Sequence, residues 1–100
     1  MIKIGCVCGM GLGSGLLVKM CVDRVLKKAG CKEGTWISEV LDTSTSRQTG
    51  IDIYVTTIEF AHNVEDMPSK LVIVKDMFNE QQVADGLLPV YKEVLKNIKE

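Results

Sequence analysis

Residues 2–15 read IKIGCVCGMGLGSG, a short apolar run that passes directly into a glycine-rich segment. The run from Ile2 to Cys8 is rich in β-branched residues and closes at Gly9, which predicts a buried strand. A helix is expected from Gly13 or Ser14 to Ala29, because apolar side chains recur there at spacings of three and four residues. A buried strand, a glycine-rich turn and a helix in this order are typical of α/β proteins.

Three more strands are expected after this unit. They are predicted where β-branched and apolar residues cluster between polar turns, at residues 35–41, 51–57 and 71–75. Strands that are buried on both faces and alternate with helices form a parallel sheet covered on each side. We therefore predict a single domain over residues 1–100 of α/β class, with a flavodoxin-like four-stranded parallel sheet in the order 2-1-3-4 and helices on both faces. Ligands of such sheets bind beyond the carboxyl ends of the strands where the winding reverses, here beside Cys8 and the loop after Val55.

The C-terminal segment carries an apolar stripe at helical spacing, which predicts a helix over residues 79–99 with Asn79 as its cap. Gly86 and Pro89 leave two alternatives, a bend in this helix or a separate short turn before Leu87. Short helical turns are also expected within two polar segments, residues 43–49 and 59–66.

Composition excludes several classes of protein. Of the 100 residues 46% are hydrophobic and 25% charged, which is the balance of a folded chain, and the net charge of −1 provides no basic field for nucleic acid. Apolar stretches such as Leu71 to Val74 are far shorter than the roughly 20 residues that cross a bilayer. The first residues also lack the features of a secretory signal. We expect a cytoplasmic protein that binds no nucleic acid and does not insert into a membrane.

The glycine-rich segment predicts a binding site for an anion. Its main-chain N–H groups can point into one concavity above a helix N-terminus, and Ser14 can cap that helix. Cys8 would lie against the positive end of the helix dipole, which favours a nucleophilic thiolate. Thr56 and Thr57 are the last residues of the strand predicted at 51–57 and are expected to be neutral donors beside the site. The residues expected to bind phosphate are Gly9, Met10, Gly11, Leu12, Gly13 and Ser14.

Three better-known loops do not fit this segment. A P-loop needs a lysine directly after its glycines, but the first one here is Lys19. A dinucleotide fingerprint needs glycine at its sixth position, where the two alignments of this loop have Ser14 and Leu16. Low-molecular-weight cysteine phosphatases, which the loop partly resembles, would have an arginine at the position of Ser14.

The remaining cysteines and the single histidine have less specific interpretations. Cys6, Cys21 and Cys31 are interpreted as reduced structural residues, because the chain has enough apolar residues to form a core without disulfides. A metal site at Cys6, Cys8 and His62 lacks the spacing of zinc ligands, so neither a metal nor a cofactor is expected. His62 could exchange a proton or a phosphoryl group with Cys8, or could simply be solvated. Cys8 itself could be an apolar strand residue before a tight turn.

The sequence CGMGLGS at residues 8–14, followed by LLVKM at 16–20, resembles the IIB subunit of the bacterial sugar phosphotransferase system, and most closely its L-ascorbate class. The resemblance extends as a pattern over the whole chain. It implies that Cys8 accepts phosphate from a phosphohistidine on the IIA protein and passes it to a sugar held by the membrane IIC permease. The protein would then be a phosphotransferase whose intermediate is a phosphocysteine.

Gly15 departs from the ascorbate class, in which a second serine is usual, so the identity of the sugar stays open. The galactitol and lactose classes share the cysteine and the fold but have different loop residues. Two other functions remain as alternatives. The domain could be a regulatory module in which phosphorylation of Cys8 changes partner binding without onward transfer. It could also be a thiol redox protein that uses Cys6 and Cys8, although neighbouring positions of one strand suit a disulfide poorly.

Overall fold

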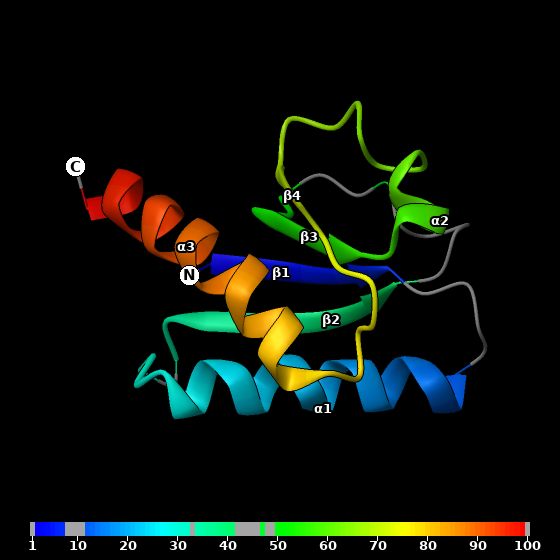
Figure 1. Cartoon of the computed structure of the whole chain (residues 1–100). Helices are drawn as coiled ribbons and strands as arrows, with labels where there is room; N and C mark the ends of the chain where they lie inside the picture. The colour runs from blue at the N-terminus through cyan, green and yellow to red at the C-terminus, as the bar shows by residue number, and fades with distance from the viewer. Residues whose placement is uncertain (1, 8–11, 33, 42–46, 48–49, 100) are drawn as a thin grey trace.

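The computed structural model describes residues 2–7, 12–32, 34–41, 47 and 50–99. These residues form a parallel sheet of four strands in the order β2-β1-β3-β4, as the sequence predicts (Figure 1). The strands are β1 (Ile2–Val7), β2 (Trp36–Leu41), β3 (Ile53–Thr56) and β4 (Lys70–Ile73). Because all strands run in the same direction, the carboxyl ends of β1 and β3 meet at one edge of the sheet.

Helices cover the two faces of the sheet unequally. The long helices α1 (Leu12–Lys28) and α3 (Glu80–Lys99) pack on one face and contact each other. The single-turn helix α2 (Ile58–Ala61) lies across the sheet from α1 (Figure 1). It confirms a short helical turn near the start of residues 59–66, whereas most of the segment 43–49 lies outside the described residues. The prediction of helices on both faces is therefore confirmed.

A separate hydrophobic cluster lies under each face. Side chains from all three elements β1, β3 and β4 face α1 and α3 in the larger cluster, which includes Ile4, Cys6, Val22, Val55, Val83 and Leu87. The smaller cluster lies on the α2 side and comprises Val7, Leu41, Ile51, Tyr54 and Val64. Burial on both faces explains why β1 and β3 are nearly continuous apolar runs. None of the helices in the described part of the chain is both long and apolar enough to cross a bilayer.

The strands predicted at residues 51–57 and 71–75 are shorter in the structure than in the sequence pattern. Ile51 and Val74 are buried but lie outside β3 and β4. The sequence pattern follows burial, which extends beyond the residues that pair by hydrogen bonds in the sheet. The main chain after β4 nevertheless continues toward β3, since the Val74 amide donates to the Thr56 carbonyl oxygen over 2.9 Å.

Helix ends agree with the expectations at most positions. Asn79 is the predicted cap of α3, and its Oδ1 accepts a hydrogen bond from the Gln82 amide over 3.2 Å. Helix α1 begins at Leu12, earlier than the expected Gly13 or Ser14. Ser14 is thus inside the first turn of α1 and does not occupy the cap position predicted for it, because the helix starts two residues before it.

Helix α3 continues through both residues that were expected to interrupt it. Pro89 lies inside the helix and removes one main-chain donor, whose acceptor would be the Asp85 carbonyl. Asp85 and Pro89 are both exposed, so water can bind the carbonyl that loses its partner. Gly86 is tolerated for a different reason, a close approach to β4.

Candidate functional site

The carboxyl end of β1 is held in place by its neighbour β3. Val7 is the last residue of β1 and is fully buried. The Thr56 hydroxyl donates a buried hydrogen bond to the Val7 carbonyl oxygen over 3.2 Å. This contact fixes the main chain directly before Cys8. Cys8, Gly9, Met10 and Gly11 lie outside the described residues, so what the sequence predicts for them stays a prediction.

The other end of the glycine-rich segment is the first turn of α1. Leu12, Gly13 and Ser14 have helical backbone there. The first four N–H groups of a helix have no acceptor within the helix, and the dipole gives this end a partial positive charge. The segment for which the sequence predicts an anion site therefore begins directly after a fixed strand end and ends in the first turn of a helix, where negative charge is favoured.

Thr57 follows β3 and has an unusual environment. Its Oγ1 is buried from solvent, and it is the one such side-chain atom without a hydrogen-bond partner among the described residues. Thr57 occupies the N-cap position of α2 but makes no side-chain capping bond, and its backbone is extended, with φ −93° and ψ 165°. A buried hydroxyl without a partner is unfavourable, so this group is available to a ligand.

Two polar residues near this edge have local roles. Asp76 follows β4 and its Oδ1 accepts a hydrogen bond from the Phe78 amide over 2.9 Å, which is the turn-forming contact of an aspartate. His62 caps the C-terminal end of α2 and is exposed to solvent. Helix α2 lies across the sheet from α1 (Figure 1), and no hydrogen bond among the described residues links His62 to the first turn of α1.

The cysteines other than Cys8 pack in or against the larger hydrophobic cluster. Cys6 and Cys21 are buried in the larger cluster, which confirms their interpretation as structural residues. Cys31 is half-buried against the same cluster. Burial raises the pKa of the Cys21 thiol and that of the Cys31 thiol, so both favour the protonated form that is a poor nucleophile. In the described ranges no group of His, Cys, Asp or Glu side chains could hold a metal ion.

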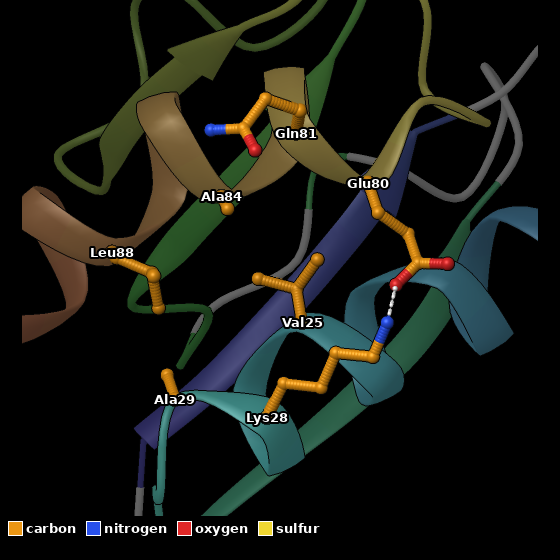
Figure 2. A pocket seen from close by; sticks show the side chains of 7 residues that line it. All are labelled: Val25, Lys28, Ala29, Glu80, Gln81, Ala84 and Leu88. Carbon is orange, nitrogen blue, oxygen red and sulfur yellow. Dashed lines mark hydrogen bonds and ion pairs between the residues drawn. The ribbon is translucent and has the colours of Figure 1, made fainter.

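A shallow pocket between α1 and α3 contains none of the predicted site residues. Its volume is about 260 Å³, and it is lined by Val25, Lys28, Ala29, Glu80, Gln81, Ala84 and Leu88 (Figure 2). Figure 2 shows the Lys28 ammonium directed at the Glu80 carboxylate, 2.9 Å away. The pocket is therefore a gap beside an ion pair that joins the two helices.

Two features of the described structure have no signature in the sequence. Arg47 donates to the Asp66 carboxylate with both terminal nitrogens, the longer bond being 3.0 Å, and to the Asn63 carbonyl oxygen over 3.2 Å. The ion pair raises the pKa of Arg47 and lowers that of Asp66 through the hydrogen bonds between them. The second feature is the unpartnered hydroxyl of Thr57. Both depend on which distant residues meet, so no local pattern could have indicated them.

The sequence of the chain is similar to those of known proteins. The family described as "PTS system, Lactose/Cellobiose specific IIB subunit" matches residues 3–87 of the chain. The matched range includes the whole glycine-rich segment and both Thr56 and Thr57. Two similar proteins, the ascorbate-specific PTS system EIIB components of Salmonella typhimurium and Escherichia coli O157:H7, are each 30% identical to it over 93 residues. The aligned residues cover 92% of this chain and 91% of each relative. The chain therefore belongs to the family of IIB subunits of the sugar phosphotransferase system.

Proposed function

We propose that this protein is a cytoplasmic phosphocarrier. It takes a phosphoryl group from a phosphohistidine on the IIA protein onto Cys8 and passes it to a sugar bound by the membrane IIC permease. The proposal needs a thiolate next to donors that hold the phosphoryl oxygens, and it needs no cofactor or metal. The single observation that supports it best is the strand end at Val7, which the Thr56 hydroxyl holds directly before Cys8 in a segment that ends in the first turn of α1.

The chemistry consists of two phosphoryl transfers. In the first, the Cys8 sulfur attacks phosphorus, an S–P bond forms, and the P–N bond to the imidazole of IIA breaks; the imidazole nitrogen leaves with the bonding electrons. In the second, a sugar hydroxyl oxygen attacks phosphorus, the S–P bond breaks, and the thiolate is regenerated while the hydroxyl proton is lost. Positioning and electrostatic stabilisation supply most of the acceleration in such transfers. We assign the stabilisation to the N–H groups of Gly9, Met10, Gly11, Leu12, Gly13 and Ser14.

An arginine clamp would not suit a carrier, because the phosphocysteine must react with its partner and resist water. The first turn of α1 provides neutral main-chain donors, whereas the Thr56 hydroxyl, which the sequence suggested as a further donor, already donates to the Val7 carbonyl oxygen. Exposed apolar side chains extend beyond the same edge of the sheet. Ile58 follows β3 and is 77% exposed, and Phe78 follows β4 and is 53% exposed. Apolar groups that remain exposed there suit short-lived contacts with IIA and IIC.

L-ascorbate, or a related sugar, is the substrate that we propose. The loop spacing and the ascorbate-specific relatives favour it, whereas the family description names lactose and cellobiose. IIB contacts the sugar only during the second transfer, so selection of the sugar belongs mainly to IIC.

Labelling tests the first transfer. Wild-type protein incubated with IIA that carries radioactive phosphate is expected to take up one label on Cys8, and Cys8→Ser is expected to take up none. Cys31→Ser is the matched control, because Cys31 is half-buried outside the site and should keep full labelling. Labelling of Cys8→Ser at normal stoichiometry would contradict the proposal.

The second transfer separates the carrier from the regulatory alternative. Membrane vesicles that contain the matching IIC are mixed with labelled protein and either L-ascorbate, lactose or cellobiose. A carrier loses its label to one of these sugars, whereas a regulatory module keeps the label on Cys8 in all three mixtures.

A further inference from the structure

We propose that the Thr57 hydroxyl is a ligand of the phosphoryl group on Cys8, to which it donates a hydrogen bond from the neighbouring strand. This inference rests on the proposed function and adds a residue outside the glycine-rich segment to the site. Its starting point is the buried Oγ1 of Thr57, which has no hydrogen-bond partner among the described residues.

The register of the sheet brings Thr57 to the correct edge. Cys6 of β1 pairs with Val55 of β3. The Thr56 hydroxyl then donates to the carbonyl of Val7, so the register between β1 and β3 holds for one more residue. In the sequence, Cys8 follows Val7 and Thr57 follows Thr56. Thr57 therefore follows β3 at the carboxyl edge of the sheet, one residue beyond the contact with Val7, the residue that precedes Cys8.

The direction of the side chain agrees with this position. Ile53 and Val55 face the larger cluster under α1 and α3, whereas Tyr54 faces the opposite cluster. The backbone of Thr57 is extended and continues this alternation. Its hydroxyl thus belongs to the face of the sheet that is covered by α1, on the side where the free N–H groups of the first turn of α1 lie.

The ordinary uses of a threonine at this position are absent. A threonine that precedes a helix normally caps it by accepting a bond from an amide in the first turn, but Thr57 makes no such bond to α2. Its neighbour Thr56 shows the other common use, a bond to a main-chain carbonyl. A buried hydroxyl that satisfies neither role costs stability in the resting protein, and a phosphoryl oxygen would relieve that cost.

The decisive comparison is between Thr57→Val and Thr57→Ser. Valine keeps the shape and removes the hydroxyl, whereas serine keeps the hydroxyl. Thr57→Val is expected to take label from phosphorylated IIA about 10- to 100-fold more slowly, because a hydrogen bond to a charged group is lost. Thr57→Ser is expected to keep most of the wild-type rate. The phosphorus NMR shift of the phosphocysteine should also move in Thr57→Val and stay unchanged in Thr57→Ser.

Stability measurements separate this role from a structural one. Because the hydroxyl has no partner before phosphorylation, Thr57→Val should unfold at the same urea concentration as wild type or at a higher one. Thr35→Val is the control at the opposite edge of the sheet, where the hydroxyl already donates to the Lys32 carbonyl; it should keep the wild-type labelling rate.

The outcomes are distinct. If Thr57→Val is labelled as fast as wild type, or if its slower labelling comes with an equal loss of stability and no change in the phosphorus shift, the inference is wrong while the proposed function stands. If wild type takes no label on Cys8, the proposed function and the inference both fail.

Discussion

At two glycines the neighbouring side chains leave no space for a Cβ atom. A Cβ atom at Gly5 in β1 would lie 2.8 Å from Leu41 Cδ1 and 3.3 Å from Tyr54 Cδ1. A Cβ atom at Gly86 in α3 would lie 2.9 Å from Val72 Cγ1. Each glycine is therefore a point of close approach, one on each face of the sheet. Gly86 is kept for packing against β4, which outweighs its poor helix propensity.

Gly86→Ala is expected to destabilise the protein. In an open helix this change would gain about 1 kcal/mol, but the new methyl group overpacks the contact with Val72 at a cost of about 1–3 kcal/mol. Val72 is buried and β-branched, so it cannot easily turn away. Urea unfolding measures the change. Combining Gly86→Ala with Val72→Ala should recover part of the loss, with a coupling of about 0.5–3 kcal/mol. A gain in stability for Gly86→Ala alone would contradict this packing argument.

At the scale of elements, α1 and α3 are joined by charge as well as by apolar contact. Glu80 in the first turn of α3 accepts from Lys28 over 2.9 Å and from Arg24 over 3.2 Å. The hydrogen bond from Lys28 is the main reason that the pKa of Glu80 is below its usual range. A carboxylate in the first turn also interacts favourably with the dipole of its own helix. One side chain therefore helps to fix how the two long helices meet.

Glu80 should make stability depend on acidity. Because its pKa is lower in the folded state, its contribution is present above the ordinary glutamate pKa of about 4.3 and is lost as the pH falls through the lowered value. Glu80→Gln should therefore unfold more easily than wild type at about pH 7, and the difference should disappear near about pH 3. The pair is exposed, so the effect should be small and should shrink in high salt.

Glu65→Gln serves as the matched control for this change, because Glu65 is exposed and makes no ion pair with a described residue. It should show no such dependence. Equal pH profiles for wild type and Glu80→Gln would show that the ion pairs with α1 do not contribute to stability.

At the scale of the whole molecule, stability is distributed unevenly across the layers. β1 and β3 are hydrogen-bonded on both sides and covered by both hydrophobic clusters. The segment after α2 is held mainly by turn bonds, such as those from Asn63 to Phe60 and from Met67 to Val64. Local opening is expected where few buried contacts hold the chain. The face covered by α2 should therefore open before the face covered by α1 and α3.

Amide hydrogen exchange followed by NMR tests this order. The amides of β1 and β3 should exchange only on global unfolding, so their exchange free energy should equal the free energy of unfolding from urea denaturation. Amides in residues 62–67 should exchange through local openings at a lower free energy. Equal protection of the two groups would show that the layers unfold together.

The sequence alone determined the α/β class and the strand order, and it predicted the edge of the sheet at which a site would lie. Its signals are local: runs of β-branched residues specify buried strands, and glycines followed by an apolar stripe specify a turn and a helix. These preferences arise from short-range sterics and burial, so they can be read without knowing the fold. The resemblance of the glycine-rich segment to IIB subunits came from the same local pattern, and the family match confirms it.

Only the tertiary structure decided what depends on residues that are distant in the chain. Thr56 meets Val7 across 49 positions, and the next hydroxyl, that of Thr57, meets no partner among the described residues. The sequence suggested that Gly86 interrupts the helix, whereas the structure shows that a side chain there would collide with Val72 of β4. Such contacts arise when strands and helices pack, and packing is set by the whole chain. The pattern of residues could therefore predict where a site would lie, whereas the structure was needed to show which hydroxyl beside it has a partner and which has none.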